Sequence, residues 1–225
     1  MTNRYTIFTC CALTVLLLTG CASRVRYPDY YVLALAPSKE PPSNESPKLA
    51  AVAVQRFETP AYLRQGRIVY RQTPEEIGFY DYHRWASDPG QVVTSAVIDS
   101  VRSTGVFSIV EAHDGQGHTE YVLSGRLERL DEIDYNNVVK VEVRLSAQLV
   151  NRKTGAAVWT GDRTATANVS DRQVSSVVRA MDHATQDVIE QLVWAMTKQL
   201  ATADLTGKTS AVSADNKAFD SGVQQ

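Results

Sequence analysis

The chain has 225 residues, of which 44% are hydrophobic and 21% charged, proportions that are ordinary for a globular protein and exclude a wholly disordered or fibrous one. Its 23 Lys and Arg residues nearly balance its 25 Asp and Glu residues, so its charge gives no indication of nucleic-acid binding. All three cysteines fall within the first 21 residues, which removes disulfides, catalytic thiolates and cysteine-bound zinc from the rest of the chain.

The first 20 residues have the layout of a secretory signal. They carry one basic residue, Arg4, followed by an apolar run over residues 7–18, and they end in small residues. As a helix, this run would cover about 18 Å, which is too short for a hydrocarbon core of roughly 30 Å. Residues 1–20 are therefore predicted to be a signal peptide, and not a membrane-spanning helix.

The signal ends in a segment, Leu18-Thr19-Gly20-Cys21, that resembles the bacterial lipobox. The resemblance implies cleavage between Gly20 and Cys21 and attachment of diacylglycerol to the Cys21 sulfur. An ordinary signal peptide with a chance cysteine is the alternative interpretation. Two or more acyl chains hold a protein stably on a membrane. Ala22 stands where an Asp would resemble an inner-membrane retention signal, so the predicted location is the periplasmic face of the outer membrane.

The next segments predict a short tether, a first strand and a loop. Residues 21–28 form the tether, in which the seven residues after the cysteine reach at most about 24 Å. Residues 30–36 are rich in strand formers, and residues 37–48 hold four prolines among polar residues, a composition typical of a loop. The apolar run at 49–54 predicts a strand that is covered on both faces.

Two short strands and a helix are expected next. Residues 67–71 and 78–82 have strand composition. Asp88-Pro89 is a typical helix start, because Asp accepts free amide hydrogens and Pro needs no donor at the first helical position. Val93, Val97 and Val101 recur at four-residue spacing, and Gly105 suits the position after the helix. A strand over 106–110 should return to the same sheet.

The clearest pattern lies in the centre of the chain, where polar and apolar residues alternate over 140–149. This predicts a strand with one buried and one solvated face. Residues 151–155 have turn composition and 157–160 continue as a returning strand, while 121–127 alternate in the same way. At least three consecutive antiparallel strands are expected.

The final helix is predicted after Ser170-Asp171-Arg172-Gln173, which looks like a capping box. Apolar residues then recur at helical spacing to about Ala201, and residues 202–225 are predicted to be a disordered tail. Residues 29–201 are thus expected to form one α+β domain, with a mixed, mostly antiparallel sheet and two main helices packed on one face.

No pattern in the sequence predicts a catalytic residue, a metal site or a cofactor. The histidine cluster of 113–118 holds His113 and His118 among Asp, Gly and Gln, and a surface loop is the favoured interpretation over a metal site. There is no G-x-S-x-G elbow and no G-x-x-x-x-G-K-[ST] phosphate loop. The chain is therefore expected not to be an enzyme.

Two aromatic segments are candidates for partner binding, because amphipathic rings in loops are typical of interaction surfaces. The first contains Tyr62 and Leu63, and the second ends at Trp85. Core packing is the alternative for all three residues, and for Trp85 it is the favoured one.

Besides the lipobox, several segments follow one another at characteristic separations: Tyr30-Tyr31-Val32-Leu33, a strand ending in Phe57, Pro60-Ala61-Tyr62-Leu63, Arg67-Ile68-Val69, Arg84-Trp85 and Tyr121-x-Leu123-x-Gly125-x-Leu127. In these features the chain resembles the ABC-type transport auxiliary lipoprotein family over roughly residues 21–201. The resemblance implies an outer-membrane lipoprotein, without catalytic residues, that works with a mammalian-cell-entry-type substrate-binding protein and an ABC permease and ATPase. Their cargo would be phospholipid or a related hydrophobic compound.

A periplasmic structural or assembly lipoprotein of another envelope complex is the competing class, since one fold can serve both. The oligomeric state is open, although a ring of copies would suit a symmetric partner.

Overall fold

The structure is a computed structural model that describes residues 25–37, 49–115, 119–135 and 138–220. The predicted signal peptide, Gly20, Cys21 and His118 lie outside the described residues. Within them, eight strands form one mixed sheet and two long helices pack against it.

One path through the sheet follows the strand order β1, β4, β3, β6, β2, β5, and β7 and β8 continue from the other edge of β6. The strands are β1 (Asp29–Tyr31), β2 (Val52–Val54), β3 (Arg67–Arg71), β4 (Gly78–Trp85), β5 (Val110–Ala112), β6 (Tyr121–Tyr135), β7 (Val138–Asn151) and β8 (Ala157–Asn168). The predicted strand at 106–110 is thus shifted, because Phe107 makes only an isolated bridge to Leu49 before β5 begins.

Strands β6, β7 and β8 form the antiparallel meander that the alternating pattern predicts. Leu123 pairs with Leu149 and Leu127 with Leu145, so the apolar positions of β6 and β7 share one face. All four of these leucines are buried. The predicted run of consecutive antiparallel strands is confirmed.

The other edge of β6 carries two short parallel partners. β2 pairs with its first residues, from Tyr121 to Leu123, and β3 pairs further along, from Asp131 to Ile133. Between them, Glu58 makes an isolated parallel bridge to Arg126. The sheet is thus mixed: its short strands pair mainly in parallel, while its long strands pair antiparallel.

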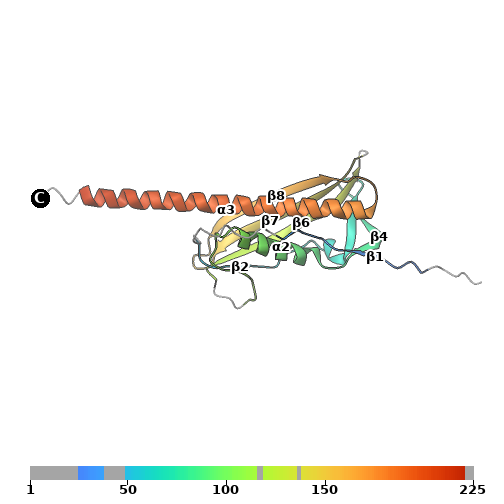
Figure 1. The fold of residues 1–225 in the computed structure, drawn as a ribbon, viewed down its shortest axis with the longest axis horizontal. Coiled ribbons are helices and arrows are strands. Elements are labelled where there is room, and N and C mark those ends of the chain that lie inside the picture. Colours follow the sequence, from blue (N-terminus) through green and yellow to red (C-terminus); the bar gives the residue numbers. More distant parts are fainter. Residues whose placement is uncertain (1–24, 38–48, 116–118, 136–137, 221–225) are drawn as a thin grey trace, which may run out of the picture.

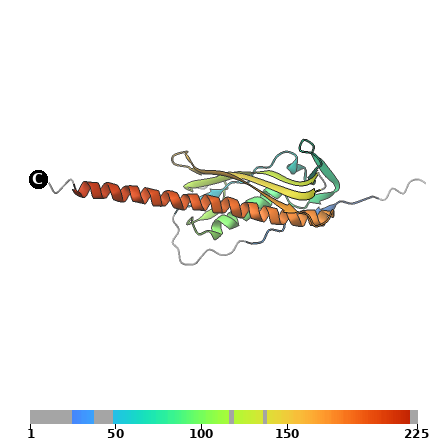
Figure 2. The same cartoon turned by 90° about the horizontal axis from the view of Figure 1, so that it is seen from above.

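Helices α2 (Pro89–Ser103) and α3 (Val174–Asp220) lie on the same face of the sheet (Figures 1 and 2). The Asp88 carboxylate accepts the Gly90 amide hydrogen at 2.7 Å, and Gly105 has a φ of 65°, so both predicted ends of α2 are confirmed. The capping box predicted at Ser170-Asp171-Arg172-Gln173 is not formed as expected, because α3 begins only at Val174; the Asp171 carboxylate instead accepts the Gln173 amide hydrogen at 2.8 Å in the turn before the helix.

The core lies between this face and the two helices. It contains the predicted stripe of α2, the inward positions of β7 and the apolar stripe of α3. Its members include Val93, Val97, Val101, Val141, Val143, Leu145, Met181, Val188, Leu192 and Met196. Burying each large apolar side chain contributes about 1.5–3 kcal/mol, and this packing holds the helices on the sheet. The predicted single α+β domain is confirmed.

Helix α3 continues well beyond the sheet (Figure 1). The prediction places its end near Ala201 and a segment without regular structure after it, but the helical backbone extends to Asp220. Adding a residue to an existing helix costs much less than nucleating a new one, so a packed helix can extend past its last core contact.

Candidate interaction site

Two of the three predicted partner-binding residues lie in the core. Leu63, in the short 3-10 helix η1 (Leu63–Gln65), is 1% exposed, and Trp85, at the end of β4, is 6% exposed. The Trp85 amide donates to the Gly66 carbonyl oxygen at 2.8 Å, which holds the end of β4 against the turn after η1. Leu63 and Trp85 are therefore core residues, as favoured for Trp85, and burial leaves neither side chain more than a small surface for contact with a partner.

Tyr62 is half-buried. Its hydroxyl donates to the Glu128 carbonyl oxygen at 3.2 Å, and the Arg71 guanidinium lies 5.9 Å from its ring centroid. Burial raises the pKa of the Tyr62 hydroxyl above its ordinary value, and the nearby Asp131 carboxylate adds to this. Tyr62 thus keeps part of its surface accessible while its hydroxyl stays protonated.

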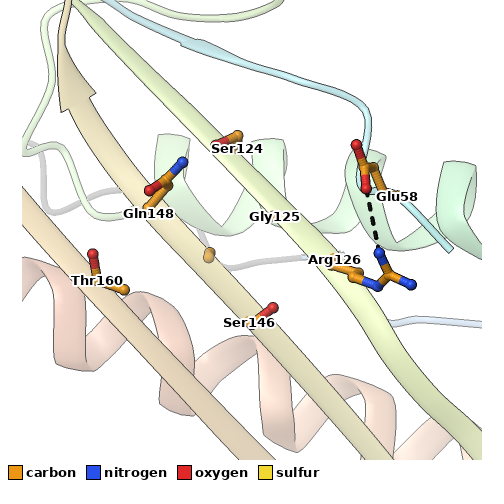
Figure 3. A pocket seen from close by; sticks show the side chains of 8 residues that line it. Glu58, Ser124, Gly125, Arg126, Ser146, Gln148 and Thr160 are labelled. Carbon is orange, nitrogen blue, oxygen red and sulfur yellow. Dashed lines mark ion pairs between the residues drawn. The ribbon is translucent and has the colours of Figure 1, made fainter. Parts of the chain in front are cut away.

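The face of the sheet away from the helices carries polar side chains and a depression of about 310 Å³ (Figure 3). Its walls come from three adjacent strands, because the register places Ser124 beside Gln148, Gln148 beside Thr160, and Arg126 beside Ser146. We call this surface, lined also by Glu58, Gly125 and Ala147, the polar depression.

Glu58 reaches the polar depression from the segment after β2. The Glu58 amide donates to the Gly125 carbonyl oxygen at 3.0 Å, and the Leu127 amide donates back to the Glu58 carbonyl oxygen at 2.8 Å. The preceding Phe57 amide donates to the Thr94 hydroxyl on α2 at 2.9 Å, so this segment is fixed from both sides. The Glu58 carboxylate then lies 3.5 Å from the Arg126 guanidinium (Figure 3).

The polar depression is suited to hydrogen bonding. The Ser146 hydroxyl donates to the Glu128 carboxylate at 2.8 Å, and the Arg126 Nε lies 3.1 Å from the same carboxylate. Its hydroxyl groups and charged side chains offer hydrogen-bond donors and acceptors to a polar partner. The sequence indicated the solvated side of each strand, but not that Glu58 would join it.

A wider depression of about 660 Å³ adjoins the polar depression, with which it shares Glu58 and Arg126. It is also lined by Arg56, Arg64 and Asp88, and the Arg56 guanidinium lies 2.9 Å from the Asp88 carboxylate. The two depressions together give the sheet a continuous charged and polar border beside β6.

Beneath Tyr62 lies a buried ion pair. Arg71 Nε donates to Asp131 Oδ2 at 2.6 Å, and Arg129 Nε lies 3.7 Å from the same oxygen. Burial raises the pKa of the Asp131 carboxyl although both cations oppose this effect. Among the described residues, Asp131 Oδ1 has no hydrogen-bond partner. The pair ties β3 to β6 where their parallel pairing is short.

Within the described ranges, no three His, Cys, Asp or Glu side chains come together in a way that could hold a metal ion. Nor does any helix in these ranges combine the length and the apolar composition that crossing a bilayer requires.

An open mixed sheet, with both helices on one face and a polar depression on the other, defines an α+β domain whose free face is available for recognition. The family model for the ABC-type transport auxiliary lipoprotein component matches residues 31–193, and the chain belongs to this family. The resemblance on which the sequence prediction depended is thereby confirmed. This is a family of transport lipoproteins and not a known family of enzymes, and its members are held at a membrane of the cell envelope.

Solved structures share the fold. Protein XCC0632 from Xanthomonas campestris is 19% identical, with a TM-score of 0.65 over 78% of this chain and 99% of that one. An uncharacterized protein is 13% identical, with a TM-score of 0.56 over 76% of this chain and 99% of that one. No curated protein matches the sequence.

Proposed function

We propose that the chain is an outer-membrane lipoprotein, acylated at Cys21, that serves as the auxiliary component of an intermembrane transport system. The system would comprise a mammalian-cell-entry-type substrate-binding protein and an ABC permease and ATPase, and it would move phospholipid or a related hydrophobic compound. The observation that carries the proposal is the family match over residues 31–193, which follows a lipobox-like segment by ten residues.

The chemistry of the surface supports a role in docking rather than in carrying lipid. Sites for an apolar ligand are concave and lined mainly by hydrophobic side chains. Most side chains that line the two depressions beside β6 are instead those of Arg, Glu, Asp, Ser, Thr and Gln, although Phe57, Pro60, Ala61 and Ala147 also contribute. The lipoprotein would therefore receive the end of a bridging protein on this face and leave the lipid inside that partner.

The anchor can be tested directly. Mass spectrometry of the amino-terminal peptide of the membrane-purified protein should find residues 1–20 removed and acyl chains on Cys21. The protein should also fractionate with the outer membrane, and Cys21→Ser should release it. A free Cys21 thiol, or an intact leader, would contradict the proposed anchor.

Docking can be tested by photo-crosslinking in cells. A photoreactive residue at the exposed position Gln148 should give an adduct with the substrate-binding protein of the system, because Gln148 lines the polar depression. The matched control is Glu190, which is exposed on α3 behind the sheet. Equal adducts at both positions would count against docking through this face, and an adduct with another envelope complex alone would favour the assembly-lipoprotein alternative.

Charge reversal provides a second test of the same face. Arg126→Glu places a carboxylate beside Glu58 and Glu128, and it should reduce capture of the partner at least tenfold. Arg102→Glu is the control, because Arg102 is an exposed arginine that also pairs with a carboxylate, that of Asp99 on α2. Tyr62→Ala, measured beside the same control, tests whether Tyr62 contributes to docking: capture of the partner should fall if it does.

A further inference from the structure

We infer that the edge of the sheet formed by β1 and β4 lies on the lipid–water interface of the bilayer that holds the chain's anchor. Nine large apolar side chains are strongly exposed among the described residues. Five of them gather at this edge, with exposures between 40% and 79%: Val25, Tyr27, Tyr30, Val32 and Tyr82. We call these five residues the aromatic edge.

The strand register explains why this edge is exposed. β1 pairs in parallel with β4, with Tyr30 beside Arg84 and Tyr31 beside Trp85. Because side chains alternate along a strand, Tyr30 and Val32 face away from Tyr31 and Leu33, which pack on the core. Tyr82 lies on the same side as Arg84 and therefore as Tyr30.

The segment before β1 is held at the same edge. The Arg26 guanidinium lies 4.5 Å from the centre of the Tyr82 ring, a cation–π contact that joins this segment to β4. Val25 and Tyr27, on either side of Arg26, remain largely exposed. The edge thus combines aliphatic side chains with tyrosines, whose apolar rings and polar hydroxyls suit a membrane interface.

The position of the anchor indicates that the bilayer covers the aromatic edge. This inference rests on the proposed acylation of Cys21. Only four peptide steps separate Cys21 from Val25, so an extended chain keeps Val25 within about 14 Å of the anchored sulfur. A tether this short gives the aromatic edge a high effective concentration at the membrane surface.

The charges around the aromatic edge predict how it binds. Arg26, Arg67 and Arg84 face Asp29 and Asp81, whose carboxylates lie 3.5 Å from His83 Nδ1 and 3.9 Å from the Arg67 guanidinium, so these groups carry only one net positive charge. An edge with so small a net charge would bind mainly through burial of its rings, and only weakly through attraction to anionic lipid. Contact should therefore change little with ionic strength or with the fraction of anionic lipid.

Bilayer contact at this edge also sets the orientation of the domain. β1 and β4 lie at one end of the molecule, and α3 begins at that end and projects beyond the other (Figures 1 and 2). The carboxyl end of α3 would thus point away from the membrane, and the polar depression would face sideways.

The test uses the full protein, purified in detergent and reconstituted into phosphatidylethanolamine–phosphatidylglycerol vesicles that contain brominated phospholipid. Tyr27→Trp introduces a reporter at the aromatic edge. Ile109→Trp is the control, because Ile109 is 55% exposed beside β5 and far from β1. Bromine should quench the added emission of Tyr27→Trp by more than half and leave the added emission of Ile109→Trp nearly unchanged, at both low and high salt.

Equal quenching of the two variants, or quenching of neither, would overturn the inference. Emission of Tyr27→Trp that shifts with protein concentration but not with bromine would also overturn it, because a second copy would then cover the edge. Mass spectrometry of the same sample reports on the anchor separately. If Cys21 carries no acyl chain, its thiol is coupled to a maleimide phospholipid and the measurement is repeated, so the aromatic edge is tested even where the proposed anchor fails.

Discussion

Arg71 Nε on β3 donates to Asp131 Oδ2 on β6 over 2.6 Å, in an ion pair whose side chains are only 10% and 0% exposed. β3 and β6 pair in register over only three residues, so this contact supports a short interface. Removing one partner of a buried pair is costly, because the other charge is left without compensation in a poorly solvated place.

We expect Asp131→Ala to lower the free energy of unfolding by about 3–5 kcal/mol, because it strands the Arg71 charge. Urea denaturation followed by circular dichroism measures this. Asp162→Ala is the control, since Asp162 pairs with Arg144 at 2.9 Å on the exposed face, where such pairs contribute at most about 1 kcal/mol. Similar losses for both variants would contradict the assigned role of the buried pair.

The buried carboxyl of Glu132 should make the stability of the protein depend on pH. Burial raises the pKa of its carboxyl, although the Tyr80 hydroxyl donates to it at 2.8 Å and opposes the shift. The folded state therefore holds the proton at a higher pH than the unfolded state, whose reference value is 4.5. The contribution of Glu132 is thus most favourable below that value, and it is lost as the pH rises through the raised pKa.

Glu132→Gln removes this ionisation, so it should raise the urea midpoint at pH 7 and flatten its decline between about pH 4 and 7. Tyr80→Phe should have the opposite effect on the slope, because it removes a donor that favours the charged form. If the urea midpoint of Glu132→Gln declined more steeply with pH than that of the unsubstituted protein, the predicted direction of the pH dependence would be wrong.

Local patterns predicted those elements whose boundaries depend on nearby residues. The alternation in β7 and the Asp88 cap of α2 are of this kind, since periodicity and capping act within a few residues. β2 and β3 each pair with β6 over three residues, and so short a strand carries no pattern that identifies its partner. The partners of the parallel strands could therefore be assigned only from the structure.

The candidate site was predictable only in part, for the same reason. The composition of residues 60–63 predicts Tyr62 and Leu63 equally as candidates for partner binding, but whether Leu63 faces solvent depends on the turn that η1 makes. The polar depression joins three strands with Glu58, which enters from a separate segment. Its membership depends on cross-strand register, which a single strand does not encode.

Gly125 explains how the floor of the polar depression is built. A Cβ at this position would lie 2.4 Å from the Phe57 ring and 2.8 Å from the Ser146 carbonyl oxygen, so glycine is needed for this close approach. We expect Gly125→Ala to destabilise the protein by about 1–3 kcal/mol through overpacking. Ser124→Ala is the control, since Ser124 directly precedes Gly125 and lies on the solvated face of β6; it should change stability by less than about 0.5 kcal/mol.

The same change should affect docking, because Phe57 immediately precedes Glu58. Displacing the ring shifts the wall of the polar depression, so crosslinking from Gln148 should fall in Gly125→Ala while the domain remains folded. Unchanged stability together with unchanged crosslinking would show that the close approach of Phe57 to Gly125 is not required.

The projecting part of α3 predicts a sharp difference in local stability along one helix. Residues 174–200 carry the apolar stripe that packs on the sheet. In the sequence of residues 202–220, eight of 19 residues are Ser, Thr or Asp, and large apolar residues occur only at Leu205, Val212 and Phe219. Helical backbone without tertiary packing opens readily, since a helix of this composition is marginal in water.

Hydrogen exchange should therefore find the amides of residues 203–220 nearly unprotected, while those around Val188 and Leu192 exchange only through global unfolding. Removing residues 203–225 should change the free energy of unfolding, measured in urea, by less than about 0.5 kcal/mol, because the deleted segment follows the last core residues identified in the described part of α3. Protection of the projecting segment in the isolated protein would contradict this account. Protection that appears only when the transport partner is added would instead identify the segment as part of the docking surface, at the end of the molecule farthest from the aromatic edge.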